Sequence, residues 1–470
     1  MPFTGTGTGI QNANDVFFSG LAQDNVLRYN STTAKWNNLA LNVGAADITD
    51  GVITEPKLAV ANSPTANQVL SWNGSALAWV TPAGGTVSGQ SARSALAVVY
   101  ASTVPSGVKP SATDAAQFVW VCDGTSDDVE INAALSAVAA QGRGKVQLVG
   151  NLFSISATIA MQTGVWLSGE GMGTILSAAT AINDGVIMLA DNTVHATKLS
   201  DLSINGAGKA VHGIHYLEDT AGLFTSTPST SPDPAHIIDS LYIYSCGTAT
   251  FGGYGMWMQG SALRAGKYSN IRILDCSGGG VFCDLSPDSH YTNIECGSCG
   301  KNGPAYSEVI TAPIGHAFYV SGSNNMFTQC KGWYARGAGF YNKGVRNQYV
   351  NCQAQDNYSY GFHLSYGKIS LVGCHADSNG QASGASGMGR AGFYLAGDTI
   401  VMGNCMAYDK AEGGTAWEQQ WGFKFVSNLP YSRVTGCATY GNGLTTSGGS
   451  QTGTIAATTT VDIQADVNGG

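Results

Sequence analysis

The sequence predicts an all-β fold, a parallel β-helix solenoid, on three observations. Two residue types recur at intervals of 22 along the chain: Phe318, Phe340 and Phe362, and Cys330, Cys352 and Cys374. A fixed period of roughly 20–50 residues is typical of a solenoid, whose repeats bury their apolar faces by stacking on one another. Apolar and polar residues alternate around the cysteines, as at 350–355, and a period of two predicts strands. Finally, turn residues separate these strands and no helical period appears.

The turn residues are asparagine and glycine. Asn357, Asn379 and Asn442 each lie five residues after a cysteine, and asparagine tolerates the left-handed conformation of a tight corner. A Gly-Phe pair such as Gly361-Phe362 then opens the next strand. We therefore expect cysteine, phenylalanine and asparagine ladders, with successive rungs about 4.8 Å apart. Cys246, Cys276 and Cys296 are expected to belong to the same cysteine ladder.

The first 83 residues are a different kind of sequence. The motif at 27–30 followed by Trp36 recurs at 70–73 followed by Trp79, with every match offset by 43 residues. Both copies are typical of small β-hairpins. Units of this size cannot bury a core alone, so we expect them to associate with copies of themselves.

Residues 84–111 are rich in Gly, Ser, Ala and Pro and are expected to form a linker, with one strand-like patch at 97–100. The β-helix is then expected over 112–470. Near its start, Ser126 or Asp127 is positioned to cap a short α-helix at about 127–140. The expected apolar positions of this helix are Val129, Ile131, Ala134, Leu135 and Val138. A helix at this place would close the exposed end of the solenoid.

Two of these features resemble phage tail proteins. The turn at 123–128 with its cap helix, followed by the glycine run at 169–173, resembles the opening segment of pectate-lyase-like β-helix tailspikes. The 43-residue repeats resemble the N-terminal segments of phage tail fibres. This resemblance implies a right-handed β-helix and a homotrimer that residues 1–83 attach to other tail proteins. It also implies a tail fibre, tailspike or minor tail protein of the virion.

Composition excludes several other classes. Only 11% of residues are charged, the net charge is −9 and no basic run occurs, which argues against a nucleic-acid partner. No apolar run approaches the roughly 18 residues of a membrane span. The N-terminus lacks the features of a signal peptide, so we expect synthesis in the host cytoplasm. The eleven cysteines are an odd number and are expected to be unpaired, while Cys296 and Cys299 lack the second pair of a zinc site. We expect no metal and no cofactor.

Three insertions indicate which side of the solenoid is its functional face. The spacing from a cysteine to the next phenylalanine is 10 residues at Cys330 and Cys352, but 19 after Cys374, 18 after Cys405 and 22 after Cys296. These loops are expected to leave one side of the solenoid, which is often its binding face. The alternative is that they contact neighbouring subunits of an oligomer.

Candidate catalytic carboxylates follow the cysteines on the same rungs. Asp356, Asp377 and Asp409 come four, three and four residues after a ladder cysteine and are expected to line one edge. Two carboxylates one rung apart raise each other's pKa, as a glycosidase pair requires. The alternative is that they are ordinary corner residues. The catalytic motifs of polygalacturonases and the calcium-binding acidic cluster of pectate lyases are not found.

Exposed aromatic rings beside polar groups suit a sugar chain. The candidate glycan-binding residues are Trp333, Tyr334, Tyr358, Arg390, Trp417, Glu418 and Trp421. The first reading of function is a tail fibre or spike that binds a bacterial surface polysaccharide during host adsorption. The second is a tailspike depolymerase, an endoglycosidase or lyase, that cleaves this polysaccharide. The third is a stand-alone polysaccharide-degrading enzyme.

Overall fold

The computed structural model describes fifteen segments of the chain: residues 16–17, 25–30, 35–40, 69–72, 77–80, 95–109, 118–217, 236–248, 252–261, 263–300, 315–381, 390–409, 419–425, 432–442 and 460–465. The chain divides into two units, Met1–Gln90 and Ser91–Gly470, and each is described by itself. In the described segments, no helix has the length and apolar character needed to cross a membrane.

The first unit contains the two expected hairpins. Strands β2 (Asn25–Asn30) and β3 (Lys35–Ala40) are antiparallel, and β1 (Val16–Phe17) adds to β3 in parallel. Strands β4 (Val69–Trp72) and β5 (Leu77–Val80) form the second antiparallel pair. The prediction of one hairpin per 43-residue repeat is confirmed.

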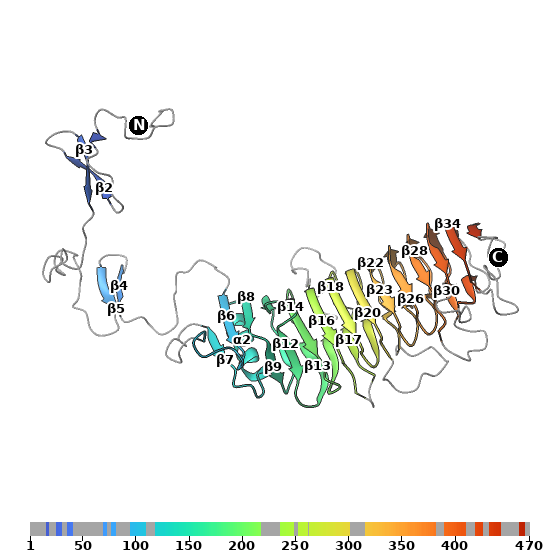
Figure 1. Cartoon of the computed structure of the whole chain (residues 1–470), viewed down its shortest axis with the longest axis horizontal. Helices are drawn as coiled ribbons and strands as arrows, with labels where there is room; N and C mark the ends of the chain where they lie inside the picture. The colour runs from blue at the N-terminus through green and yellow to red at the C-terminus, as the bar shows by residue number, and fades with distance from the viewer. Residues whose placement is uncertain are drawn as a thin grey trace. The chain divides into compact units, whose positions relative to one another are not determined.

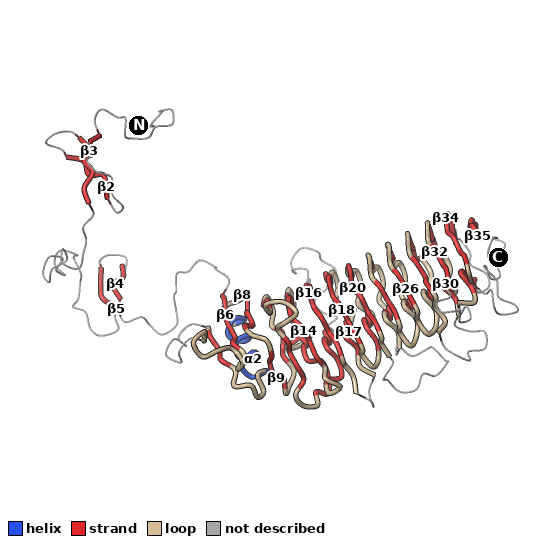
Figure 2. Tube along the Cα trace, viewed as in Figure 1, coloured by secondary structure: helices blue, strands red, loops and turns tan. Residues whose placement is uncertain are grey.

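The second unit is a right-handed parallel β-helix, in which two sheets run along the solenoid and all strand pairs within them are parallel (Figures 1 and 2). The ten-stranded sheet consists of β10 (Ile159–Met161), β13 (Ile182–Leu189), β15 (Ala210–Leu217), β17 (Tyr254–Gln259), β19 (Gly279–Asp284), β21 (Phe318–Val320), β24 (Phe340–Asn342), β27 (Phe362–Leu364), β30 (Ala391–Leu395) and β33 (Trp421–Phe425).

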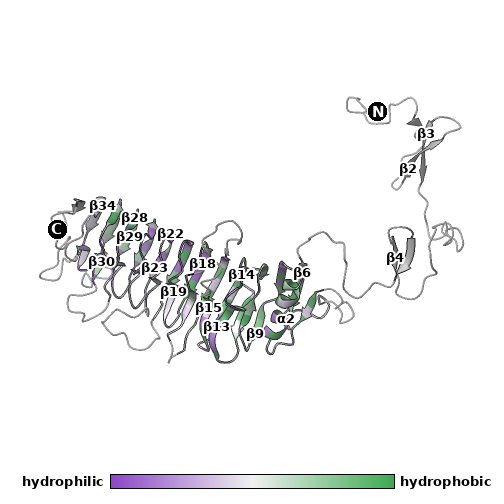
Figure 3. Ribbon diagram, turned by 180° about the vertical axis from the view of Figure 1, so that it is seen from behind, coloured by the Kyte–Doolittle hydropathy of each residue, from purple (hydrophilic) through white to green (hydrophobic). Residues whose placement is uncertain are grey.

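The twenty-stranded sheet consists of β6 (Ala95–Tyr100), β7 (Val119–Val121), β8 (Gly144–Val149), β9 (Leu152–Ile155), β11 (Val165–Ser168), β12 (Ile175–Ala178), β14 (Lys198–Asn205), β16 (Ile237–Tyr244), β18 (Lys267–Leu274), β20 (His290–Gly297), β22 (Met326–Thr328), β23 (Lys331–Trp333), β25 (Gln348–Val350), β26 (Gln353–Gln355), β28 (Ile369–Val372), β29 (His375–Asp377), β31 (Ile400–Gly403), β32 (Met406–Tyr408), β34 (Arg433–Tyr440) and β35 (Thr460–Ala465). Hydrophobic and hydrophilic residues lie side by side along the strands, as expected when one face is buried (Figure 3).

The phenylalanine ladder forms the centre of the core. The rings of Phe318, Phe340, Phe362, Phe393 and Phe423 are all fully buried on successive strands of the ten-stranded sheet. Their ring centroids are 4.5, 4.7, 4.9 and 4.9 Å apart and the rings are nearly parallel. The 22-residue period therefore corresponds to one complete turn of the solenoid. The predicted phenylalanine ladder is confirmed.

The cysteine ladder is confirmed from Cys330 to Cys437 but is wrong before Cys330. Strand register places Ile294, not a cysteine, on the preceding rung. Cys246 and Cys276 form a second column with Cys299, since Ser277 N–H donates to Cys246 O at 2.8 Å and Gly300 N–H donates to Cys276 O at 2.7 Å. The earlier rungs differ in length, so spacing alone cannot identify which column a cysteine occupies. All eleven cysteines are buried free thiols.

Left-handed residues, one per rung, bend the twenty-stranded sheet. Each one comes directly after a residue that is in register with its counterpart on the next rung, as Ser269 is with Thr292. The left-handed residues therefore stack into a column, which we call the bend ladder. Its members are Asp201, Ser240, Asn270, Asn293, Gln329, Asn351, Gly373, Asn404 and Gly436. Asparagine and glycine are frequent among them because both adopt positive φ at low cost.

The expected asparagine ladder exists, but with a different conformation and cause. Positive φ falls on Asp356 and Ser378, the residues before Asn357 and Asn379. Asn357 and Asn379 are fully buried, and Asn357 Nδ2 donates to Asn379 Oδ1 at 2.8 Å. Their side chains therefore satisfy one another inside the solenoid instead of forming the corner itself, which follows the rule that buried polar groups are hydrogen-bonded.

The α-helix α2 (Asp128–Ala139) covers the open end of the solenoid, as expected. Asp127 accepts hydrogen bonds from Gly124 N–H at 2.9 Å and Ser154 N–H at 2.7 Å, so its carboxylate joins the helix to β9 rather than capping the helix. Asn132 accepts from Ala160 N–H at 2.8 Å and thereby satisfies β10, the terminal strand of its sheet. The helix thus pairs backbone groups that a bare sheet edge leaves open. Val129, expected on the apolar face, is 59% exposed.

Strand β6 lies in the stretch that was expected to be a linker. It pairs with β7 and with all six residues of β8, and Ala97 and Val99 are fully buried. The alternation that gave a strand-like patch at 97–100 is therefore part of the β-helix, which begins before residue 112.

Candidate functional site

The three insertions leave the solenoid at the same corner, between the end of the twenty-stranded sheet and the following strand of the ten-stranded sheet. Residues 301–314, 382–389 and 410–418 lie outside the described residues, but the chain on either side is described. The insertions precede β21, β30 and β33, and the last two strands are neighbours. The expectation of a common side is confirmed. We call this edge of the solenoid the insertion corner.

On the rungs between these insertions, the corner carries exposed aromatic rings. Trp333 ends β23, and Tyr334 follows it with 41% of its surface exposed. Their ring centroids are 5.5 Å apart in an edge-on arrangement. Tyr358 lies one rung further on, because its N–H donates to Ala335 O at 2.9 Å. These rings present apolar surface at the same edge from which the insertions leave.

A second group of candidates meets two rungs later. Trp421 N–H donates to Arg390 O at 3.0 Å, so these residues lie side by side on β33 and at the start of β30. Lys424 Nζ is 4.0 Å from the Trp421 ring centroid, and burial lowers the pKa of this lysine. All three side chains are half-buried. Trp417 and Glu418 lie outside the described residues.

The three aspartates are at this corner but not in one column. Asp356 is in register with Ser378, whereas Asp377 is in register with Gln355 and Tyr408. The expectation that they line one edge therefore fails for Asp377, because its spacing from the cysteine is one residue shorter. Asp356 accepts from Gln355 Nε2 at 3.0 Å, and Asp377 accepts from Ser378 Oγ at 2.7 Å.

Asp409 is 3% exposed and has a structural contact. Its Oδ2 accepts a hydrogen bond at 2.7 Å from the backbone N–H of Gln419, across the insertion at 410–418. The carboxylate therefore closes the base of this loop. Asp356 and Asp377, both half-buried, remain the candidate carboxylates at the corner.

A polar hollow lies beside Trp333, on the outer face of the twenty-stranded sheet. It has a volume of about 570 Å³, and its lining includes Asn270, Asn293 and Asn351 of the bend ladder together with Glu295 and Lys331. Glu295 Oε1 accepts from Trp333 Nε1 at 2.8 Å, which links the hollow to the insertion corner. Side-chain amides and charged groups in a shallow hollow suit a hydroxyl-rich ligand more than an apolar one.

Beside the insertion corner, a stripe of aromatic rings follows the outer face of the ten-stranded sheet. We call it the outer aromatic stripe; its members are Trp257, Phe282, Tyr319, Tyr341, His363 and Tyr394. Adjacent ring centroids are between 4.4 and 5.5 Å apart. Phe282, Tyr319 and Tyr341 are buried. The stripe reaches solvent through its half-buried ends, Trp257 and Tyr394, and through His363, which is also half-buried.

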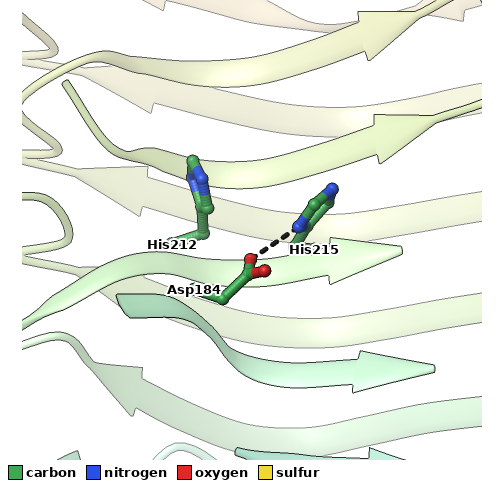
Figure 4. Close-up of side chains that lie close together, drawn as sticks. All are labelled: Asp184, His212 and His215. Carbon is green, nitrogen blue, oxygen red and sulfur yellow. Dashed lines mark hydrogen bonds and ion pairs between the residues drawn. The ribbon is translucent and has the colours of Figure 1, made fainter. Parts of the chain in front are cut away.

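At the first of these ends, three side chains that sequence reasoning missed come together (Figure 4). His215 Nδ1 lies 2.6 Å from Asp184 Oδ1, and His215 Nε2 lies 2.9 Å from Gln259 Oε1. Burial alone raises the pKa of Asp184, but the hydrogen bond and charge of His215 hold it below its ordinary value. The cluster depends on β13, β15 and β17 lying side by side, and their separation along the chain hides it in the sequence.

His212 completes this cluster as a neutral ring. Burial, followed by the charge of His215, lowers its pKa to about 4. Its Nδ1 accepts the backbone N–H of Tyr254 at 3.1 Å, so the ring proton resides on Nε2. With both nitrogens so engaged, His212 has no lone pair for a metal ion. As the described residues are arranged, this Asp-His-His group therefore does not offer three ligand atoms to a metal ion.

Several solved structures are similar to this chain. The Dettilon tailspike protein has a TM-score of 0.50 and 11% identity, over 78% of this chain and 68% of that one. The enzymatically active domain of tailspike protein 2 from bacteriophage CBA120 has a TM-score of 0.49 and 19% identity, over 67% of this chain and 45% of that one. The A-module of an Azotobacter vinelandii mannuronan C-5 epimerase has a TM-score of 0.48 and 15% identity, over 72% and 97%. At 11% identity, the likeness to the Dettilon tailspike protein shows the fold alone. No family model and no curated protein matches the sequence.

Proposed function

We propose that this chain is a phage tail fibre or tailspike that binds a bacterial surface polysaccharide at the insertion corner. The observation that carries the proposal is the gathering of Trp333, Tyr334, Tyr358, Arg390 and Trp421 along one edge of a rigid solenoid. Aromatic rings cover the apolar faces of sugars, while nearby amide and charged groups bind hydroxyls. The β-helix fold shared with solved tailspikes supports this assignment.

The proposal extends to assembly. Residues 1–83, with hairpins too small to bury a core alone, join the chain to other tail proteins and to two further copies in a homotrimer. The protein acts in the virion tail, at the adsorption step. Light scattering of the full-length protein tests the trimer, and a monomer would contradict it.

Adsorption is tested with the purified protein and a bacterium that the phage infects. The labelled wild-type chain is expected to bind intact cells and their isolated envelope polysaccharide, and to compete with phage adsorption. Cells stripped of surface polysaccharide are the control. Equal binding to stripped and intact cells would reject a glycan receptor.

A second candidate function is cleavage of the same polysaccharide. It is favoured by two partly exposed carboxylates, Asp356 and Asp377, at the corner where the aromatic rings lie. Incubation of the protein with the envelope polysaccharide should then release new reducing or unsaturated ends. Binding without any such product would leave adsorption as the sole function.

A further inference from the structure

A column of basic side chains runs along the outer face of the twenty-stranded sheet, at strand positions in mutual register. We call it the basic column, and its members from β8 to β20 are Lys145, Trp166, Lys198, Ile237, Lys267 and His290. Every one of these side chains is partly or fully exposed. The column contains no carboxylate, in a protein whose net charge is −9.

Two of the lysines are held in place by the tryptophan between them. Lys145 Nζ and Lys198 Nζ each lie 4.1 Å from the centroid of the Trp166 ring. The indole Nε1 donates to Ser200 Oγ at 2.9 Å, which fixes the ring. A cation over an aromatic face is attracted by the negative face of the ring, even at an exposed site. The ammonium groups are therefore ordered before any ligand binds, which lowers the entropic cost of binding.

Two carboxylates beside the column take their hydrogen bonds from other groups, although the charge of Lys198 also helps to lower the pKa of Asp239. Asp239, on the neighbouring column, accepts hydrogen bonds from Ser269 Oγ at 2.5 Å, Asn270 Nδ2 at 2.9 Å and Ser240 Oγ at 3.0 Å. Asp201 accepts from Ser200 Oγ at 2.6 Å. In the described part of the chain, no carboxylate oxygen lies within ion-pair distance of Lys145, Lys198 or Lys267.

The spacing of the lysines points to the ligand. Lys145, Lys198 and Lys267 occupy every second rung, so with rungs about 4.8 Å apart their Cα atoms recur at about 10 Å. The ammonium groups of Lys145 and Lys198 are somewhat closer, because each lies 4.1 Å from the centroid of the same Trp166 ring. This is comparable to the length of a disaccharide. A nucleic-acid strand instead carries one phosphate per about 3.4 Å, so most phosphates would have no lysine.

We propose that the basic column binds an acidic polysaccharide that carries one carboxylate per disaccharide, aligned with the solenoid axis. The inference rests on the proposed function and names the class of its glycan. It adds a surface separate from the insertion corner, one that selects for charge while the corner supplies aromatic contacts.

The test uses two probes and two triple variants. The probes are the host envelope polysaccharide, native or with its carboxyls reduced to alcohols, and a hyaluronan decasaccharide, which has one carboxylate per disaccharide. Replacing Lys145, Lys198 and Lys267 with Gln should weaken binding of both acidic probes at least tenfold and flatten its dependence on NaCl. Gln at Lys109, Lys209 and Lys343 makes the same charge change outside the column and should leave binding unchanged.

Each outcome supports or contradicts a specific part of the proposal. Equal binding of native and carboxyl-reduced polysaccharide, or equal loss in the two triple variants, overturns the basic column. If the native host polysaccharide is not bound but hyaluronan is bound through the three lysines, the proposed host-glycan function fails while the anionic site stands. Duplex DNA that binds as tightly as hyaluronan at matched charge would show a non-specific polyanion surface and reject the glycan assignment.

Discussion

The side-chain oxygen of Gln419 accepts two hydrogen bonds from Asn379, one from its backbone N–H at 3.0 Å and one from its Nδ2 at 3.1 Å. Gln419 thus takes the place that Asn379 itself takes for Asn357 on the rung before. The ladder then continues to Asn442, whose Oδ1 accepts from Gln419 Nε2 at 2.6 Å. A buried chain of amides therefore crosses the rung from which residues 410–418 leave.

Breaking this chain should destabilise the solenoid. Asn379→Ala removes the side-chain oxygen that accepts from Asn357 Nδ2 and the side-chain donor to Gln419 Oε1, at a cost of about 1–3 kcal/mol in the interior. The backbone N–H of residue 379 still donates to Gln419 Oε1. The expected result is a lower midpoint of thermal or denaturant unfolding. Asn151→Ala, at an exposed position, is the matched control and should leave the midpoint unchanged. An equal midpoint for both variants would show that the amide chain contributes nothing net.

The thiols should be reduced and unreactive in the native state. Burial raises the pKa of Cys283 to about 12 and that of Cys352 well above its ordinary value, so both remain protonated near neutral pH. The thiolate is the reactive form. Iodoacetamide at pH 8 should therefore label almost no cysteine until denaturant is added, and then all eleven. Non-reducing mass analysis that finds intramolecular disulfides would contradict this.

Stability should fall in mildly acidic solution, in part through His212. Its folded pKa of about 4 lies below the roughly 6.5 of a free histidine, so the unfolded chain gains the proton first. This stabilisation is complete above pH 6.5 and is lost as the pH falls toward 4. Half-buried His363, whose pKa is lowered to about 3, acts in the same direction.

The measurement is the unfolding midpoint between pH 7.5 and pH 4.5. His212→Gln should reduce the loss of stability over this range by about 1–3 kcal/mol. The reason is that the variant lacks a group that binds a proton more readily in the unfolded chain than in the folded one. His195→Gln changes a less buried histidine and serves as the control. An unchanged pH profile in His212→Gln would place the acid sensitivity elsewhere.

At the insertion corner, Trp421→Ala should weaken adsorption to host polysaccharide about tenfold, the equivalent of roughly 1.4 kcal/mol. The reason is the loss of an aromatic surface that a sugar ring covers. Tyr366→Ala removes a ring that is 51% exposed in the turn after β27, away from this corner, and is the matched control. Equal effects of the two variants would move the site away from the corner.

Cleavage, if present, should separate from binding. Asp377→Asn or Asp356→Asn is then expected to abolish new reducing or unsaturated ends while adsorption is kept, since an acid or nucleophile acts chiefly in the transition state. Asp409→Asn should instead lower stability, because its carboxylate accepts Gln419 N–H. Product release that survives both of the first two changes would remove these carboxylates from the chemistry.

Period and alternation sufficed to predict the repeating half of the fold. Phe340 and Phe362 stack because residues separated by one full turn of a solenoid occupy equivalent positions on neighbouring rungs. This holds wherever all rungs have the same number of residues. Sequence spacing failed where rung length changes. Cys296 is in register with Gly332, not with Cys330, because the rung between them contains the insertion at 301–314.

The sequence predicted where the candidate site lies on the solenoid, but not the position of every side chain in it. The insertion corner followed from counting residues, and Arg390 and Trp421 do meet there. The side on which a single residue points cannot be counted in the same way, as Asp377 and buried Asp409 show. Asp184 and His215 meet across neighbouring strands that no common period connects, so no sequence pattern marked them.

One half of each rung has a constant length, and the sequence varies in length only in the other half. From phenylalanine to cysteine the chain keeps 12 residues on four rungs, while the return path ranges from 10 to 19 residues, with the difference placed at the insertion corner. Because each rung contacts mainly its neighbours, a loop there can be lengthened, shortened or exchanged without altering the stacked interior. Exchange of loops at this corner therefore changes the exposed surface of the solenoid while the inherited scaffold stays the same.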